Sequence, residues 1–210
     1  KPEILIHAAW NGVKVSDRDN WIEQEKNLSF FISLLEIVKK AGVNKIIALG
    51  SQAEYGPFEG SLNEDYPCNP NSAYGAIKLC ASTLLKAFTK QYKIEWYWIR
   101  IFSVFGPRDN ENWLIPATIQ NFIKGKPMKL SPCEQKYDYQ YVKDFAFGIL
   151  SVINKKENKS GIYNFCHSES IPLKELLIQI ANLMGVSKKL LQFGAIPYRN
   201  GQNMFIIGDN

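Results

Sequence analysis

The chain has 210 residues, of which 46% are hydrophobic and 13% aromatic, so it can bury a core as one large domain or two small ones. Its net charge of +5 comes from scattered lysines and arginines, which predicts no nucleic-acid partner and would suit an anionic substrate. We see no secretory signal and no apolar run long enough to span a membrane, so we expect a cytoplasmic protein without a membrane partner.

The cysteines and histidines do not form a metal-binding pattern. The four cysteines lie far apart without a C-x-x-C spacing, and the chain has only two histidines. We therefore expect reduced thiols and no metal site. The residues concerned are Cys68, Cys80, Cys133, Cys166, His7 and His167.

Strands and helices alternate along the first half of the chain. Short apolar runs predict strands that are buried on both faces of a parallel sheet, and longer segments with an apolar stripe predict helices. In chain order the elements are a strand at Ile4–Ala9, a helix at Asp19–Ala41, a strand at Lys45–Leu49, a helix at Ser72–Tyr92 and a strand at Trp96–Ile101. The long loop Gln52–Asn71 is of a length that often marks function.

The pattern becomes looser after Gly106-Pro107. We expect Ser170 to cap the last helix and Pro172 to lie in its first turn. In chain order the elements are a helix at Asn112–Lys124, strands at Met128–Leu130 and Tyr137–Tyr141, a helix at Asp144–Asn154, a strand at Ile162–Phe165 and a helix from Ser170 to about Gly185.

Three segments with candidate functional residues follow predicted parallel strands. They are His7 to Trp10, Ser51, and Phe102-Ser103. In open parallel sheets, ligands bind beyond the carboxyl ends of the strands. The three segments therefore predict one shared site.

Tyr74 and Lys78 are four residues apart at the start of a predicted helix, so their side chains lie on one face. A nearby ammonium favours phenolate, so we expect Lys78 to lower the pKa of Tyr74. Tyr74 is then a candidate general acid/base for interconverting a hydroxyl and a carbonyl, and Ser51 can hydrogen-bond the same substrate oxygen. We expect a second Tyr-x-x-x-Lys, Tyr139 to Lys143, to be incidental.

Five motifs resemble, in order and spacing, those of extended short-chain dehydrogenase/reductases of the NAD-dependent epimerase/dehydratase family, which modify nucleotide sugars. They are Ile6-His7-Ala8-Ala9, the segment from Gly50 to Gly56, Tyr74-Gly75-Ala76-Ile77-Lys78, the segment from Arg100 to Pro107, and the segment from Tyr137 to Asp144.

The resemblance implies an α/β fold with a Rossmann-type doubly wound parallel sheet, incomplete at its N-terminus, and a smaller interleaved C-terminal substrate-binding region. We expect 1–106 to form the nucleotide-binding part and 107–210 mainly the substrate region, with 144–165 returning to the sheet. Relatives often dimerise through two long helices, which correspond to 19–41 and 72–92 here. A homodimer is therefore plausible.

The resemblance also implies roles for individual residues. It assigns catalysis to Ser51, Tyr74 and Lys78, with NAD or NADP as the cofactor. Implied cofactor contacts, besides Tyr74 and Lys78, are His7, Ala8, Ala9, Asn27 and Phe102. Implied substrate contacts are Trp10, Gln52, Ser103, Asn112, Leu114 and Arg199, the last on the diphosphate.

Three departures from the family pattern matter. None of the 14 glycines forms the glycine-rich dinucleotide fingerprint, so we expect the chain to be a fragment that lacks the first strands. Gln52 and Ala53 replace the Asp-Glu pair that relatives use to eliminate water, which argues against a 4,6-dehydratase. Tyr137 stands where many relatives have arginine, so we expect one phosphate contact to be absent or moved.

The sequence thus predicts NAD(P)-dependent oxidoreduction at a sugar carbon, C4 above others, of a nucleotide sugar. A 4-epimerase and a 4-keto reductase both remain open. The alternative is a non-catalytic cofactor-binding or scaffolding protein of the same fold.

Overall fold

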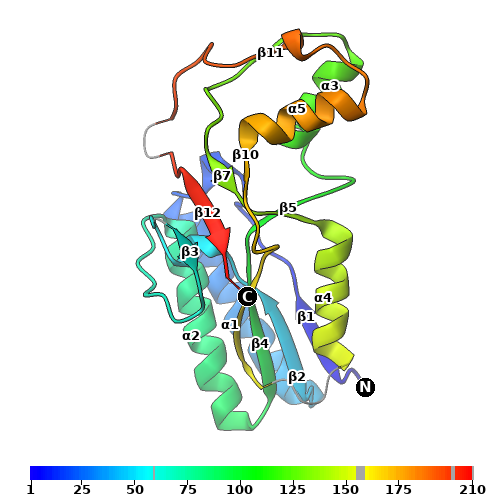
Figure 1. Ribbon diagram of the computed structural model, residues 1–210. Helices are drawn as coiled ribbons and strands as arrows, with labels where there is room; N and C mark the ends of the chain where they lie inside the picture. The colour runs from blue at the N-terminus through cyan, green and yellow to red at the C-terminus, as the bar shows by residue number, and fades with distance from the viewer. Residues whose placement is uncertain (59, 155–158, 200–201, 210) are drawn as a thin grey trace.

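A computed structural model describes residues 1–58, 60–154, 159–199 and 202–209 (Figure 1). Its centre is a sheet of four parallel strands in the order β1-β2-β4-β9. The strands are β1 (Ile4–His7), β2 (Lys45–Leu49), β4 (Glu95–Ile101) and β9 (Gly161–Phe165). The predicted parallel, Rossmann-type α/β fold is confirmed, although β1 ends at His7 and not at Ala9.

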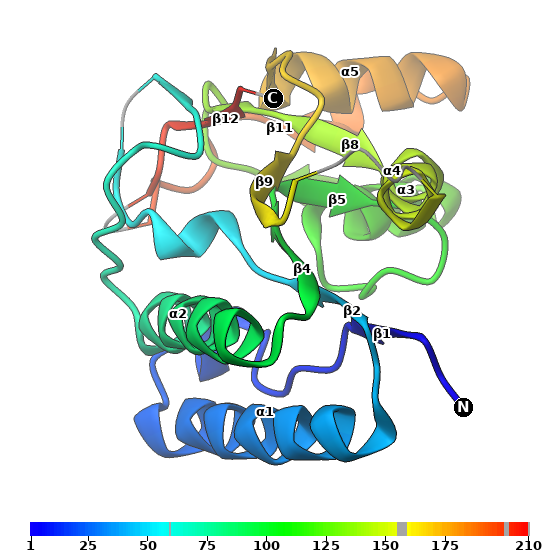
Figure 2. The ribbon, with the colours of Figure 1, turned by 90° about the horizontal axis from the view of Figure 1, so that it is seen from below.

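Helices cover both faces of this sheet (Figure 2). On one face, α1 (Trp21–Ala41) and α2 (Ala73–Tyr92) pack against Ile46, Ala48 and Trp98. On the other face, α4 (Val142–Asn154) packs against a cluster that includes Ile47, Tyr97 and Ile99. Because successive strand residues point to opposite faces, a sheet covered on both sides requires the near-continuous apolar runs seen in the sequence.

Polar caps define the ends of the two long helices. The side chain of Asn20 accepts the N–H of Glu23 and caps α1, which begins at Trp21, two residues after the predicted start at Asp19. Gly42 ends the helix with φ 66°. Ser72 caps α2 by accepting the N–H of Gly75, as the predicted boundary requires. These caps hold the amino ends of both helices at the edge where β1 and β2 end.

The remaining elements form a smaller region beyond this edge (Figure 1). A second core cluster joins its helices α3 (Leu114–Ile123) and α5 (Leu173–Leu183) to a parallel pair of short strands. The short elements here and in the loops are η1 (Val15–Asp17), η2 (Gln52–Glu54), η3 (Lys188–Leu190), β3 (Ser61–Leu62), β5 (Ser103–Phe105), β6 (Met128–Lys129), β7 (Lys136–Tyr137), β8 (Tyr139–Tyr141), β10 (Ile171–Pro172), β11 (Leu191–Gln192) and β12 (Phe205–Gly208).

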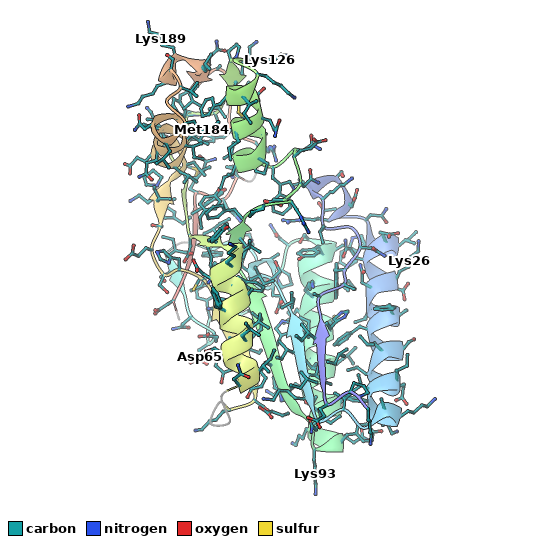
Figure 3. The ribbon with its side chains drawn as sticks, turned by 90° about the vertical axis from the view of Figure 1, so that its right-hand side faces the viewer. Lys26, Asp65, Lys93, Lys126, Met184 and Lys189 are labelled. Atoms are coloured by element: carbon teal, nitrogen blue, oxygen red, sulfur yellow. The ribbon has the colours of Figure 1, made fainter. Side chains whose placement is uncertain are left out.

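The molecule is elongated, with the end of α2 far from the smaller region. Figure 3 places Lys93 at one end and Lys126 and Lys189 at the other. Strand β12 runs beside β3 and β7 in a second sheet of order β10-β7-β12-β3. The division into 1–106 and 107–210 stays a prediction. Among the described residues, no helix is long and apolar enough to cross a membrane.

Two predictions for the second half are wrong. The expected strand at Tyr137–Tyr141 is divided into β7 and β8 at Asp138, whose buried carboxylate accepts the N–H groups of His167 and Ser168. Ser170 does not cap α5, because the N-cap is Pro172, which makes no side-chain capping bond. Most of the unpredicted strands have only two or three residues, too few to show a period in sequence.

Candidate active site

The serine loop begins where β2 ends. The N–H of Gly50 donates to the carbonyl of Ile99 at 2.7 Å. A Cβ at Gly50 would overlap the indole of Trp98, so only glycine fits this turn. Ser51 then caps η2, because its Oγ accepts the N–H of Ala53 at 3.2 Å.

Glu54 anchors this loop to the sheet. Its carboxylate is fully buried and accepts the N–H of Ser51 at 2.8 Å. It also accepts Trp98 Nε1 at 2.8 Å and Arg100 Nε at 2.9 Å, both from β4. Glu54 therefore serves the structure of the loop and does not face a substrate.

The first turn of α2 lies directly on the serine loop. A Cβ at Gly75 would overlap the carbonyl oxygen of Ala53, so the glycine permits this close approach. As a result Ser51 lies close enough to Tyr74 that its hydroxyl acts to lower the pKa of the phenol. The structure thus brings two of the three predicted catalytic residues close together.

Two buried amides of α1 hold the loop that follows β1. Asn27 Oδ1 accepts the N–H of Asn11 at 2.8 Å, and its Nδ2 donates to the Asn11 carbonyl at 3.0 Å. Gln24 Nε2 donates to the Gly12 carbonyl at 2.8 Å, and Gln24 Oε1 accepts Trp10 Nε1 at 3.0 Å. Asn27 was expected to contact the cofactor, but both polar atoms of its side-chain amide are hydrogen-bonded to the backbone of this loop. Sequence reasoning missed Gln24, although it lies one turn before Asn27 on the same helix.

Lys78 is buried beneath Trp10. Its Nζ donates to the Leu49 carbonyl at 2.6 Å and lies 3.6 Å from the centre of the Trp10 ring. Burial lowers the pKa of Lys78 to about 7, while the charge of Glu54 opposes this. The indole face, which attracts cations, also favours the ammonium.

Arg18 is a functional candidate that the sequence analysis missed. Its carbonyl accepts the N–H of Tyr74 at 2.8 Å, and its Cζ lies 5.1 Å from the centre of the Tyr74 ring. Its Nε donates to the Val13 carbonyl at 3.1 Å. No motif marks this arginine, because the contact depends on how the loop before α1 folds over α2.

The expectation that Lys78 lowers the pKa of Tyr74 is wrong for this structure. Burial raises the pKa of Tyr74, while the hydroxyl of Ser51 and the charge of Arg18 act to lower it. Lys78 Nζ lies 5.9 Å from the Tyr74 ring centre. The cost of burying a phenolate outweighs its partners when the ring is only 7% exposed.

The residues at the end of β1 were predicted to contact the cofactor. Ala8 and Ala9 are exposed and small, so a planar ligand could approach the backbone closely. His7 is buried against Phe31, with ring centres 4.9 Å apart. Among the described residues, its Nε2 has no hydrogen-bond partner, which leaves one polar atom for a ligand or water.

The other predicted site residues lie in several different elements. Phe102 is buried in a core cluster with Tyr55 and Leu62, so it packs inside the protein. Gln52 is half-buried beside Ser51. Ser103 lies in β5, Asn112 in the exposed turn before α3, Leu114 at the first position of α3, and Arg199 in the exposed segment before β12. Within the described chain, no group of three His, Cys, Asp or Glu side chains could hold a metal.

Comparison with known proteins identifies one family. A sequence model described as "NAD dependent epimerase/dehydratase family" matches residues 1–166. The chain is 29% identical to a UDP-glucuronate 4-epimerase of Thermodesulfobacterium geofontis, over 70% of this chain and 46% of that protein. It is 26% identical to a dTDP-6-deoxy-L-talose 4-dehydrogenase (NAD(+)) of Aggregatibacter actinomycetemcomitans, over 98% of this chain and 75% of that protein.

Solved structures show the same fold. A UDP-N-acetylglucosamine 4-epimerase from Methanobrevibacter ruminantium superimposes with a TM-score of 0.90 at 25% identity, over 99% of this chain and 67% of that one. A dTDP-glucose 4,6-dehydratase from Streptomyces venezuelae superimposes with a TM-score of 0.84 at 22% identity, over 99% and 64%. The chain spans 46%, 51% and 61% of three of the curated relatives it matches.

Proposed function

Because the chain belongs to the NAD dependent epimerase/dehydratase family, we propose that it interconverts a hydroxyl and a carbonyl at C4 of a nucleotide sugar, as an epimerase or a 4-keto reductase. The observation that carries the proposal is the grouping of three side chains: Ser51 at the start of η2 lies close to Tyr74, and the buried Lys78 Nζ lies 5.9 Å from the Tyr74 ring centre.

Each of these side chains has a distinct task in this proposal. Tyr74 takes the proton from the sugar hydroxyl when a carbonyl forms, and returns it in the reverse step. Ser51 donates a hydrogen bond to the same oxygen and orients it. A bound nicotinamide cofactor supplies the hydride chemistry, for which the protein provides only orientation and proton transfer.

The chain's own residues hold part of the proposed cofactor site. Lys78 would bind a ribose hydroxyl, and Ala8 and Ala9 would lie against the nicotinamide half. NAD is the family's cofactor by its description. No glycine-rich fingerprint is present among the 14 glycines of this sequence, so the residues named here account for the nicotinamide side alone.

Two features support an epimerase or reductase over a 4,6-dehydratase. Water elimination needs an acid beside the serine, and Gln52 and Ala53 cannot supply one. Glu54, the next carboxylate in the chain, is fully buried and accepts three hydrogen bonds from Ser51, Trp98 and Arg100. Dehydratases at 22% identity share the fold and do not decide the reaction.

The test is a screen of UDP-glucose, UDP-glucuronate and UDP-N-acetylglucosamine with NAD or NADH, with products identified by NMR. We expect a C4 epimer or a 4-hydroxy/4-keto conversion and no 4-keto-6-deoxy product. Tyr74→Phe should lower turnover by about 10²–10⁴-fold with substrate binding nearly unchanged, because it removes the hydroxyl that transfers the proton and keeps the ring. Tyr92→Phe, on the same helix and bonded to Lys39, should leave turnover unchanged.

Turnover by Tyr74→Phe within threefold of the parent would contradict the proposal. Cofactor binding without conversion of any sugar would instead support the non-catalytic alternative. A 4-keto-6-deoxy product would show that another residue supplies the missing acid.

A further inference from the structure

The guanidinium of Arg18 lies against the proposed catalytic tyrosine. Its Cζ is 5.1 Å from the centre of the Tyr74 ring, and the main-chain carbonyl of Arg18 accepts the N–H of Tyr74 at 2.8 Å. The loop before α1 therefore brings a positive charge next to the place where the proposed function puts C4 of the sugar.

Hydrogen bonds of this loop hold one edge of the guanidinium and leave its other end available. Nε donates to the Val13 carbonyl at 3.1 Å, while the two terminal nitrogens of Arg18 make no hydrogen bond with the described residues. Gln24 holds the same loop by donating to the carbonyls of Gly12 at 2.8 Å and Asp17 at 3.3 Å. The terminal nitrogens are thus positioned by the fold before any ligand binds.

Arg18 also lacks an anionic partner in the part of the chain that the structure describes. It forms no ion pair there, although aspartates precede and follow it in the sequence. Arg100 provides the contrast, because its Nε lies 2.9 Å from Oε2 of Glu54 and both of these side chains are buried. Arg18 is only half-buried, so an anion from solution can reach it.

The position of Arg18 beside Tyr74 selects the part of a nucleotide sugar that it can meet. In the proposed reaction the C4 hydroxyl lies at the Tyr74 hydroxyl. The diphosphate is attached to C1, across the six-membered ring from C4, whereas substituents on C3 and C5 are the neighbours of C4. A carboxylate on either neighbour would approach the guanidinium, and two terminal nitrogens of an arginine match the two oxygens of a carboxylate.

We propose that Arg18 binds a carboxylate carried beside C4 of the sugar, which makes acidic nucleotide sugars the substrate class. The inference rests on the proposed function, because that function puts C4 at Tyr74. A uronate carries the carboxylate on C5, and a muramate carries it through an ether on C3. Both present the same chemistry to Arg18.

The test compares pairs of ligands in which one member adds the carboxylate. UDP-glucuronate is paired with UDP-glucose, and UDP-N-acetylmuramate is paired with UDP-N-acetylglucosamine. Calorimetry in the presence of NAD measures the four affinities. Tyr74→Phe is the parent for every protein compared, so that conversion of the sugar does not disturb the measurement.

We expect the acidic member of at least one pair to bind more tightly than its neutral partner. Arg18→Met should reduce that ratio of affinities by about 10- to 100-fold, because it removes charged hydrogen bonds to the carboxylate. Arg18→Lys keeps the charge without the two-nitrogen end and should retain part of the preference. Lys14→Met removes an exposed cation from the same loop and should leave the ratio unchanged. The pair that responds identifies the carbon that carries the carboxylate.

A merely structural role of Arg18 would give a different pattern. Loss of its bond to Val13 would loosen the loop and weaken acidic and neutral sugars alike, so the ratio of affinities would not change. Circular dichroism confirms that the compared proteins are folded.

Acidic sugars that bind no better than their neutral partners, or a preference that persists in Arg18→Met, would overturn the inference. Both outcomes leave the proposed function intact if the wild type converts a neutral nucleotide sugar and Tyr74→Phe does not. Conversely, Arg18-dependent binding of an acidic sugar that the wild type cannot convert would refute the proposed function and leave the carboxylate site standing.

Discussion

Burial changes the protonation of a histidine at the carboxyl end of the central sheet. His7 is 4% exposed, and burial and the nearby Lys78 charge lower the pKa of His7 from 6.5 to about 4. A histidine in such a position is neutral when folded at pH values where the unfolded chain binds a proton. His7 should therefore contribute to the pH dependence of the stability of the fold.

Between pH 6.5 and about 4 the unfolded state binds a proton at His7 that the folded state excludes, so stability falls as the solution is acidified. In the wild type this linkage lowers the free energy of unfolding by up to about 1.4 kcal/mol for each pH unit of acidification in this window. We expect His7→Phe to abolish that contribution. Urea denaturation at pH 7, 6 and 5 measures it.

The control for this prediction is His167→Phe, at a side chain that is 62% exposed. It removes an exposed histidine and so tests whether the effect is specific to the buried one. An identical dependence for His7→Phe and wild type would show that His7 is protonated in the folded protein.

At the scale of elements, the site depends on how α2 meets the serine loop. Gly75 lies in the first turn of the helix, where alanine is normally favoured by up to about 1 kcal/mol. Here a Cβ would overlap the backbone carbonyl of Ala53, which cannot rotate aside. The glycine is therefore required by contact between two elements, and not by the conformation of its own helix.

We expect Gly75→Ala to destabilise the fold by about 1–3 kcal/mol, as overpacking does, despite the gain in helix propensity. The helix must move away from η2, so Tyr74 should move away from Ser51 and turnover should fall. Chemical denaturation and the sugar assay measure the two effects.

Gly161→Ala is the control, because a Cβ there would meet only the Tyr163 ring at 3.7 Å, an ordinary contact. It should change stability far less. A stable, fully active Gly75→Ala would mean that the helix start tolerates displacement.

At the scale of the whole molecule, α1 and α2 lie side by side on one face of the sheet (Figure 2). Both helices carry apolar side chains that are exposed to solvent. Ile32 of α1 is 47% exposed and Leu84 of α2 is 37% exposed. An apolar surface on paired helices is typical of a homodimer interface. The homodimer expected from the family resemblance stays a prediction.

If the chain dimerises through these helices, Ile32→Glu should shift it toward monomer, because the dimer would bury an uncompensated charge. Sedimentation velocity over a concentration series measures the shift. Ile123→Glu introduces the same change at a 66% exposed isoleucine of the smaller region and should leave the association unchanged. A monomeric wild type, or equal effects of both variants, would contradict this interface.

Local sequence was sufficient for the long elements and for the relation between Tyr74 and Lys78. The predicted helices at 19–41 and 72–92 and the four central strands follow from apolar runs and from Gly42 and Ser72, which act within a few residues of themselves. Tyr74 and Lys78 share a face because they are four residues apart. These features depend on the chain near each residue, so a single sequence predicts them.

The tertiary structure alone decided the surroundings of those residues. It places Arg18 over Tyr74, seals Lys78 beneath Trp10, assigns Asn27 to the loop after β1, and divides the predicted strand at Asp138. It also raises the pKa of Tyr74, where spacing alone predicted a decrease. Burial and the electrostatic field at a side chain sum over neighbours from distant parts of the chain, and no local pattern encodes which neighbours the fold will supply.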